Sequence, residues 1–274
     1  MKRTILGIIG LAGLMGMASC DKIESNADGT YAIYAGSTAT WVEGTPIATP
    51  VQRAYVEKYT GPRCNNCPAA DRTIEAAHEV LHEQLVAVSV NSMNEAFGAP
   101  GPNSRDMRTE DGAVWEQYWG VANYPAAYIN RNGKLYDSDM ATISADLQAA
   151  AAEAPIVALE GRVTKGDEIS IDINLEFVQE YAEPLTLSLI LIQDSLAYWQ
   201  MDGSAPVPDY VHNHMLRDVI TDVWGTDIDC TGRQGECRRA TFKYSLPEEM
   251  ENWHVVALVS DKESRRVLNS VQCE

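Results

Sequence analysis

The spacing of apolar residues changes along the chain, and the change falls near residue 155. From residue 51 to 154, short apolar runs alternate with segments in which apolar residues recur every three or four positions, which predicts alternating strands and helices. The strands and helices expected here are 54–59, 68–83, 85–90, 110–119, 126–130, 134–136 and 140–153. The segment 85–90 is apolar almost throughout, which is typical of a strand buried on both faces. An α/β domain is therefore expected in this region.

After residue 155, apolar and polar residues alternate, most clearly from Ile169 to Phe177. Alternation predicts strands with one solvated face, and several short strands separated by turn residues are typical of a sandwich. The expected strands are 156–163, 169–177, 185–193, 215–221, 240–245, 254–260 and 267–271. The predicted fold class is therefore α/β plus all-β, with an immunoglobulin-like β-sandwich over 155–274 that follows a domain over 51–154.

The N-terminal residues have the pattern of an export signal. Two basic residues precede the apolar run Ile5–Met17, which is too short and too rich in glycine for a membrane span. Small residues then precede Cys20, and this arrangement resembles the lipobox of bacterial lipoproteins, in which the cysteine is lipidated. An ordinary signal peptide is the alternative. We expect a signal peptide over 1–19 and a lipid-anchored tether over 20–50, with one short strand near Tyr31–Tyr34.

The acidic composition limits the classes of partner. The formal net charge is −18, and it becomes −20 without the signal peptide, which carries two basic and no acidic residues. Proteins that bind nucleic acid or anionic lipid by charge carry basic patches, so neither partner is expected. An exported chain meets an oxidising compartment, which allows disulfides among the cysteines that follow Cys20.

A Cys-x-x-Cys pair, Cys64 and Cys67, lies between a predicted strand and a predicted helix. The helix dipole and the free N–H groups at such a junction favour the thiolate of the first cysteine, and Arg63 adds positive potential. Cys67 lies inside the helix, where it can resolve a mixed disulfide. Two alternatives stay open, namely a structural disulfide that stiffens the helix start and half of a zinc site.

The order of elements around this pair resembles the thioredoxin fold. The resemblance implies that Pro125 is a cis-proline lying against the pair, preceded by Tyr124. It also implies a buried proton-accepting carboxylate six residues before the first cysteine, where this chain has Lys58. Glu57, one residue earlier, is the candidate for that role. The chain departs from the family at Arg63, which replaces the usual tryptophan.

Several longer segments resemble the twenty-eight-kilodalton outer-membrane-protein family of bacterial surface lipoproteins. The segments that carry the resemblance are the lipobox, 57–61, 64–68, 124–131, 212–218 and 224–225. The resemblance covers nearly all of residues 20–274. It implies a thioredoxin-like domain joined to a β-sandwich, and a lipid anchor in the outer membrane, on its periplasmic face or at the cell surface. It implies no established reaction.

Histidines and further cysteines give weaker signals. His212 and His214 would share one face of a strand near Asp209 and Asp218, which suits either a zinc or calcium site or a polar edge strand. His78 and His82 have metal-compatible helical spacing, although a solvated helix face explains them as well. The flexible loop between Cys230 and Cys237 predicts a structural disulfide. Cys273 then stays unassigned.

These observations favour a membrane-anchored thiol–disulfide exchange protein. Cys64 would attack, Cys67 would resolve, and Pro125 would shape the surface that contacts protein or peptide substrates. We expect no organic cofactor and no metal. The alternative is a non-enzymatic surface binding module, in which the pair is only a staple and the sandwich binds a host protein, a glycan or a partner lipoprotein.

Overall fold

The computed structural model describes residues 22–25, 31–34, 40–133, 135–137, 140–166, 168–246 and 250–274 of the chain. The predicted signal peptide and Cys20 lie outside the described residues. The chain divides into two units, 1–36 and 37–274. In the first unit, β1 (Lys22–Ser25) pairs antiparallel with β2 (Tyr31–Tyr34), which is the short strand predicted there. Within the described part, no helix is long and apolar enough to cross a membrane.

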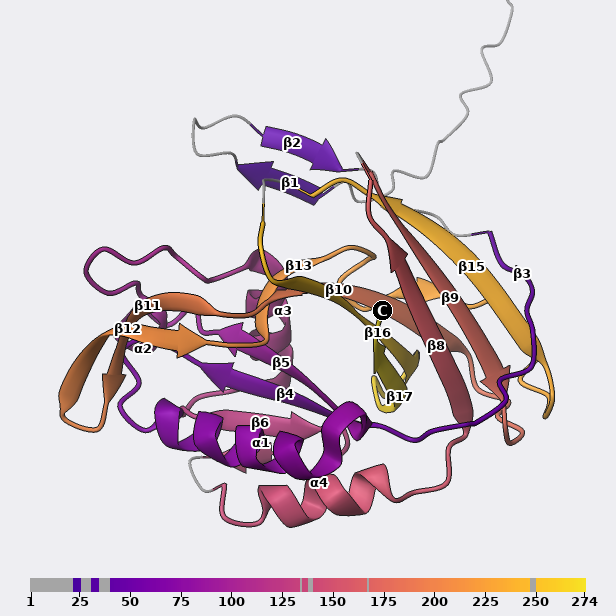
Figure 1. Ribbon diagram of the computed structural model, residues 1–274, viewed down its shortest axis with the longest axis horizontal. Coiled ribbons are helices and arrows are strands. Elements are labelled where there is room, and N and C mark those ends of the chain that lie inside the picture. Colours follow the sequence, from indigo (N-terminus) through magenta and orange to yellow (C-terminus); the bar gives the residue numbers. More distant parts are fainter. Residues whose placement is uncertain are drawn as a thin grey trace, which may run out of the picture. The chain divides into compact units, whose positions relative to one another are not determined.

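One large sheet runs through the second unit (Figure 1). Among the described residues it has nine strands, in the order β17-β16-β10-β13-β5-β4-β6-β7, with β14 paired to β10. The strands are β4 (Ala54–Thr60), β5 (Leu85–Asn91), β6 (Ala126–Ile129), β7 (Leu135–Asp137), β10 (Leu185–Gln193), β13 (Met215–Val219), β14 (Thr226–Asp227), β16 (Trp253–Asp261) and β17 (Val267–Gln272). The sheet thus takes strands from both sides of residue 155. The division into domains at that residue stays a prediction.

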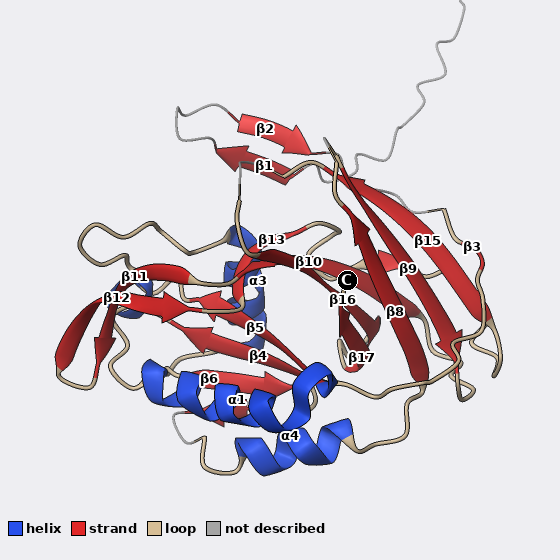
Figure 2. Ribbon diagram, in the orientation of Figure 1, coloured by secondary structure: helices blue, strands red, loops and turns tan. Residues whose placement is uncertain are grey.

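The N-terminal half of this sheet is covered by helices on both faces (Figure 2). Strands β4 and β5 are parallel, and β6 and β7 follow antiparallel. The covering helices are α1 (Cys67–Leu81), α3 (Glu110–Trp119) and α4 (Ile143–Ala151), with the short α2 (Glu95–Gly98) and the 3-10 turn η1 (His82–Gln84) between them. Val56 packs with α1 and α4, whereas Tyr55 packs with Trp115 of α3, because neighbouring residues of a strand face opposite sides.

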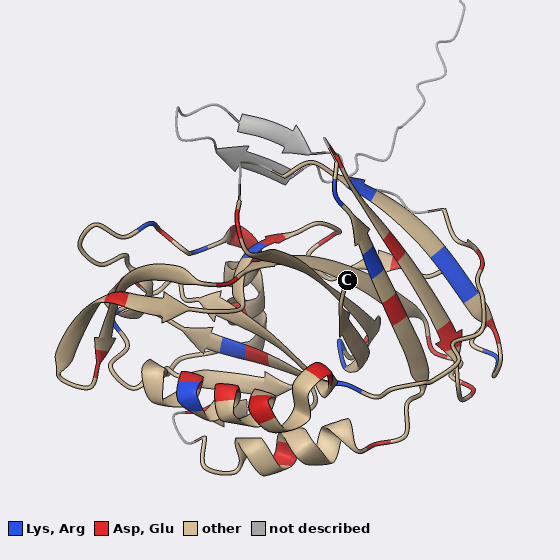
Figure 3. Cartoon of the chain, in the orientation of Figure 1, with Lys and Arg blue, Asp and Glu red and all other residues tan. Residues whose placement is uncertain are grey.

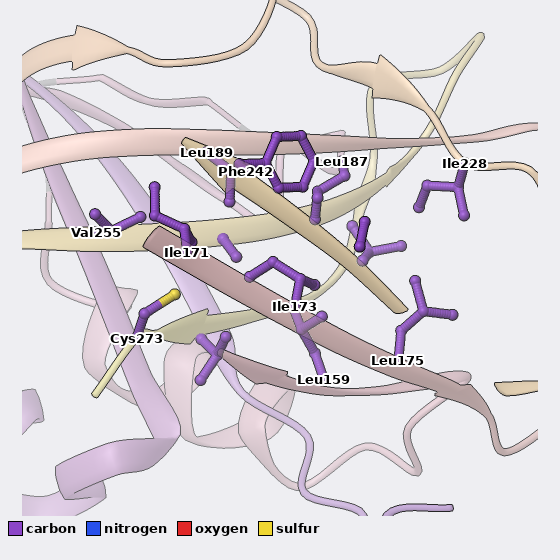
Figure 4. Packing of buried hydrophobic residues seen from close by; sticks show 14 of the residues in the cluster. Leu159, Ile171, Ile173, Leu175, Leu187, Leu189, Ile228, Phe242, Val255 and Cys273 are labelled. Carbon is purple, nitrogen blue, oxygen red and sulfur yellow. The ribbon is translucent and has the colours of Figure 1, made fainter. Parts of the chain in front are cut away.

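A second sheet packs on the C-terminal half of the first and forms the predicted β-sandwich. Its order is β3 (Val42–Glu43), β15 (Cys237–Tyr244), β9 (Ile169–Phe177) and β8 (Val157–Thr164). The apolar positions of β9 are buried and the alternate positions are partly exposed, as predicted. Figure 4 shows Ile171, Ile173 and Phe242 close to Leu187 and Leu189 in the core between the sheets.

Two segments differ from the sequence expectation. Part of the predicted tether lies on the sandwich, because β3 pairs with β15 and Ile47 is buried. A hairpin of β11 (Leu196–Asp202) and β12 (Ala205–His212) was not predicted. Its second strand contains Pro206 and Pro208, which suit only an edge strand and hide the alternating pattern.

Candidate functional site

The predicted Cys-x-x-Cys pair lies where β4 leads into α1. Cys64 and Cys67 are joined in a disulfide, with their Cα atoms 5.4 Å apart. Cys67 is the first residue of α1, and its N–H donates to the carbonyl oxygen of Cys64 at 3.3 Å. Both residues are buried, with exposed fractions of 1% and 0%. The pair therefore occupies the expected helix N-terminus, but its sulfur atoms are shielded from solvent.

Arg63 fixes the loop that leads into the disulfide. Its side chain donates hydrogen bonds to the carbonyl oxygens of Ala99 and Pro100, and its N–H donates to the carbonyl oxygen of Phe97 at 2.9 Å. A Cβ atom at Gly61 would lie only 2.3 Å from the same Phe97 oxygen, so this close approach requires glycine. The loop is therefore held against the segment that follows α2.

Tyr124 and Pro125 lie at the start of β6, joined by a cis peptide bond. Tyr124 belongs to the buried cluster that also contains both cysteines, and its ring lies 4.9 Å from that of Phe97. Its hydroxyl donates to a carboxylate oxygen of Glu116 in α3. The structure thus brings Tyr124 into the same buried cluster as the disulfide.

Glu57 is fully buried on the face of β4 that points away from α1. Its carboxylate accepts hydrogen bonds from Tyr55 at 2.8 Å and Tyr59 at 2.5 Å, and it forms an ion pair with Arg131. The Arg131 guanidinium also lies 4.4 Å from the centre of the Trp115 ring. Burial and the Glu57 charge raise the pKa of both tyrosines well above the ordinary value. The carboxylate of Glu57 is thus already fully engaged.

Lys58 occupies the position beneath α1 that the resemblance assigned to a carboxylate. Its ammonium group forms an ion pair with Asp71, which lies one helical turn beyond Cys67. Burial lowers the pKa of Lys58 to about 7, although Glu75 opposes the shift. Sequence reasoning missed this pair, because nothing in the sequence around Lys58 signals that an acidic residue of α1 meets it.

A cavity of about 320 Å³ opens beside this pair, between α1, β5 and β12. Its polar lining includes Lys58, Asp71, Glu75, Tyr210 and His214. The Tyr210 hydroxyl donates to Asp71 at 2.8 Å and so links the hairpin to α1. Figure 3 shows several acidic positions along α1.

The β11–β12 hairpin covers the loop that carries the disulfide. The side-chain amide of Gln200 donates to the carbonyl oxygens of Cys64 at 3.0 Å and Gly61 at 3.3 Å. The N–H groups of Met201 and Gly203 donate to the carbonyl oxygens of Pro62 and Asn65, each at 2.8 Å. Two further residues of β11 add contacts. Asp202 pairs with Arg72 of α1, and Trp199 packs on Gly101.

The predicted pairing of His212 and His214 on one strand face is wrong. His212 is buried at the end of β12, whereas His214 lies beyond the strand, where its backbone has a φ of 58°. The turn directs His214 toward Glu75 and Asp194, at 3.5 Å from each. The His78 ring lies 5.7 Å from that of His214. Within the described ranges, no group of three metal-binding side chains has a suitable arrangement.

The predicted bridge between Cys230 and Cys237 is absent, and both residues are free thiols. The loop between them is closed instead by the Glu236 carboxylate, which accepts hydrogen bonds from the N–H and the hydroxyl of Thr231. Cys273 is also a free thiol, buried against Gly161.

Together, the sheet, the sandwich and the buried disulfide define a largely β-sheet protein with a Cys-x-x-Cys disulfide at a helix N-terminus. The family model for outer membrane protein Omp28 matches residues 113–274, and the chain belongs to this family. The protein is accordingly located at the outer membrane. The match covers the sandwich and the region from α3 onward, and it does not include the disulfide.

The first two of three solved structures show a similar fold at low sequence identity. HBP35 of Porphyromonas gingivalis matches with a TM-score of 0.64 and 17% identity, over 82% of this chain and 76% of that chain. A structural-genomics protein from Agrobacterium tumefaciens matches with a TM-score of 0.50 and 15% identity, over 82% and 96% of the two chains. A domain of the outer membrane lipoprotein Omp28 from Porphyromonas gingivalis matches 44% of this chain and 89% of that chain, with 15% identity and a TM-score of 0.31. No curated protein matches the chain.

Proposed function

We propose that this protein is a lipid-anchored thiol–disulfide exchange protein of the outer membrane, which acts on protein or peptide substrates through Cys64 and Cys67. The observation that carries the proposal is the disulfide at the N-terminus of α1. Such a junction is where proteins of this chemistry hold their reactive cysteines.

The arrangement of elements around the disulfide supports a thioredoxin-like domain. The chain runs from β4 through the disulfide into α1, returns in the parallel strand β5, and then passes through α3 to β6, β7 and α4. The helices α1 and α4 cover one face, and α3 covers the other. This chain order supports the proposal of a thioredoxin-like domain around the disulfide.

The local electrostatics favour a thiolate once the disulfide is reduced. Helix α1 has 15 residues, so its dipole and the free N–H groups of its first turn lie beside the pair. The first turn of α1, which is fully described, holds no acidic residue and no side-chain cap that would compete for these groups. A thiolate at Cys64 would therefore be the attacking species.

The chemistry balances without a cofactor. A substrate thiolate attacks the Cys64 sulfur, which forms a mixed disulfide and releases the Cys67 thiolate. The second substrate thiolate then attacks the substrate sulfur of the mixed disulfide and releases Cys64. The substrate loses two electrons and two protons, and the protein gains them as two thiols. The reverse sequence, begun by Cys64 on a substrate disulfide, is the reduction.

The variant Cys67→Ser tests this assignment, because it removes the resolving thiol and traps the mixed disulfide at Cys64. We expect the reduced variant to capture a disulfide-bonded peptide, and mass spectrometry to place the link at Cys64. The matched control is Cys64→Ser, which removes the attacking thiol and should capture none. Equal capture by both variants, or capture by neither, would contradict the roles.

The anchor is a separate proposal, since Cys20 lies outside the described residues. It rests on the lipobox-like sequence before Cys20 and on the outer-membrane family. The variant Cys20→Ser should move the protein from the detergent phase to the aqueous phase in a detergent-partition assay. Retention of the variant in the detergent phase would refute lipidation at Cys20.

The burial of the disulfide favours one rival function. Cys64 is only 1% exposed, as expected for a structural staple in a surface binding module. In that case the pair would contribute stability by constraining the unfolded chain, and replacing both cysteines by alanine would leave partner binding unchanged. The trapping experiment separates the two functions, because a staple captures no substrate.

A further inference from the structure

The β11–β12 hairpin stands apart from the large sheet and from the sandwich. Its strands pair with each other, and neither of them joins another sheet in the described part of the chain. A hairpin of this kind is marginally stable alone, so its position depends on the surfaces that it contacts. The contacts that hold it include the hydrogen bonds to the disulfide loop, the pair Arg72–Asp202 and the hydrogen bond from Tyr210 to Asp71. Trp199 also packs on Gly101, and its N–H donates to the Ser104 hydroxyl.

The contact with the disulfide loop is made by two backbone hydrogen bonds. Met201 lies in β11, and Gly203, with a φ of 59°, lies in the turn that follows β11. Their N–H groups donate to the carbonyl oxygens of Pro62 and Asn65, on either side of Cys64. Strand β11 itself pairs with β12. The hairpin therefore occupies the backbone acceptors that flank the reactive cysteine.

The two ends of the hairpin have a geometry that suits a hinge. Ser195, before β11, and His214, after β12, both have positive φ angles, of 60° and 58°. The N–H of Ser195 donates to Asn213, and the N–H of His214 donates to Asp194, so the two ends are fastened to each other. A rotation at these two points would lift the hairpin and leave β10 and β13 in place.

In this arrangement, the burial of Cys64 restricts the access of a substrate thiolate to its sulfur. A thiolate must approach the Cys64 sulfur along the disulfide bond, but Cys64 is buried. We propose that the β11–β12 hairpin is a displaceable strap, and that an extended polypeptide segment of the substrate replaces β11 on the carbonyl oxygens of Pro62 and Asn65. This inference rests on the proposed exchange function and names its substrate class.

The geometry selects a polypeptide over a small thiol. Lifting β11 leaves two backbone acceptors without donors, and an unpaired acceptor in a covered site is costly. A polypeptide segment supplies backbone N–H groups that can replace those of Met201 and Gly203, as backbone donors do when a peptide is recognised through its main chain. A small thiol supplies no such pair, so the strap would close over it again.

The first experiment measures how fast dithiothreitol reduces the Cys64–Cys67 disulfide. The variant Gln200→Ala removes two hydrogen bonds to the loop, and we expect reduction about tenfold faster than in the wild type. The matched control is Asp209→Asn, an exposed change on β12 that should leave the rate unchanged. Amide exchange in β10 verifies that Gln200→Ala has not opened the whole fold. Equal rates in Gln200→Ala and the wild type would overturn the strap.

The second experiment tests whether a polypeptide displaces β11 from the disulfide loop. The Cys67→Ser variant is converted to a mixed disulfide at Cys64 with an extended cysteine-containing peptide or, as the control, with cysteamine. Hydrogen exchange then follows the N–H groups of Met201 and Gly203. We expect them to lose protection with the peptide and to keep it with cysteamine. Protection in both conjugates would refute displacement by a polypeptide.

These results are separable from the proposed function. The first measurement uses the protein's own disulfide, the second uses a mixed disulfide prepared at Cys64, and neither needs turnover of a substrate. If the hairpin is a strap but the protein has no exchange activity, Gln200→Ala should speed reduction and Cys67→Ser should capture no peptide. Exchange activity without a strap would give trapping and equal reduction rates.

Discussion

The ion pair between Glu57 and Arg131 supports a direct prediction, because it lies wholly inside the protein. The side chains of Glu57 and Arg131 are 0% and 1% exposed. The change Arg131→Met keeps most of the apolar volume and removes the charge. It leaves the Glu57 carboxylate buried with only the hydroxyls of Tyr55 and Tyr59 as donors.

The expected loss in the free energy of unfolding follows from the interactions of Arg131 with Glu57 and Trp115. Removing one partner of a buried pair costs about 3–5 kcal/mol, because the remaining charge is left uncompensated. The contact of the guanidinium with the Trp115 ring, at 4.4 Å, adds about 1 kcal/mol. We therefore expect Arg131→Met to lower the free energy of unfolding by about 5 kcal/mol. The double change Glu57→Gln with Arg131→Met removes both charges and should cost less than Arg131→Met alone.

Urea unfolding, followed by tryptophan fluorescence, measures these free energies in a double-mutant cycle. The matched control is Arg233→Met, an exposed change that should cost less than about 0.5 kcal/mol. A coupling energy below about 1 kcal/mol would refute this account of the pair.

Three further predictions concern other parts of the fold. The hydrogen bond with the His214 side chain lowers the pKa of Glu75 to about 2 from an ordinary 4.5, although partial burial opposes the shift. The stability that this interaction gives the folded state is therefore present above pH 4.5 and is lost as the pH falls toward 2. Acid unfolding of Glu75→Gln should lack this loss, and identical acid profiles would contradict the pairing. Burial raises the pKa of Cys273 to about 12, so iodoacetamide should modify half-buried Cys230 in the native protein before Cys273, as mass spectrometry would detect. Phe242→Ala empties a core position with an exposed fraction of 1% and should cost about 3–5 kcal/mol in urea unfolding, whereas a loss below 1 kcal/mol would argue against the packed sandwich.

Elements with a strong local signal were predictable from the sequence. The strand Ile169–Phe177 has the predicted bounds, because its alternating apolar residues depend only on facing one core. The Cys-x-x-Cys pair also lies where predicted, because the start of α1 follows from Pro68 and the apolar spacing after it. Such features can be predicted from neighbouring residues in the sequence alone.

Features that join distant segments were not predictable. The large sheet is continuous through a parallel contact of β13 with β5, in which Met215 is opposite Ser89. Arg131 has the sequence context of a solvent-exposed hairpin turn, yet its contacts with Glu57 and Trp115 bury it. The hairpin over the disulfide was missed because its prolines contradict the usual strand signal. Each of these depends on residues that meet only after folding.

The reduction potential of the Cys64–Cys67 disulfide tests the proposed function most directly. It is measured by equilibrating the protein in glutathione buffers and counting the reduced fraction by alkylation and mass spectrometry. An exchange protein should have a potential of about −120 to −270 mV, within the range of catalytic disulfides. A potential below about −300 mV, typical of structural disulfides, would contradict the exchange function and favour the staple.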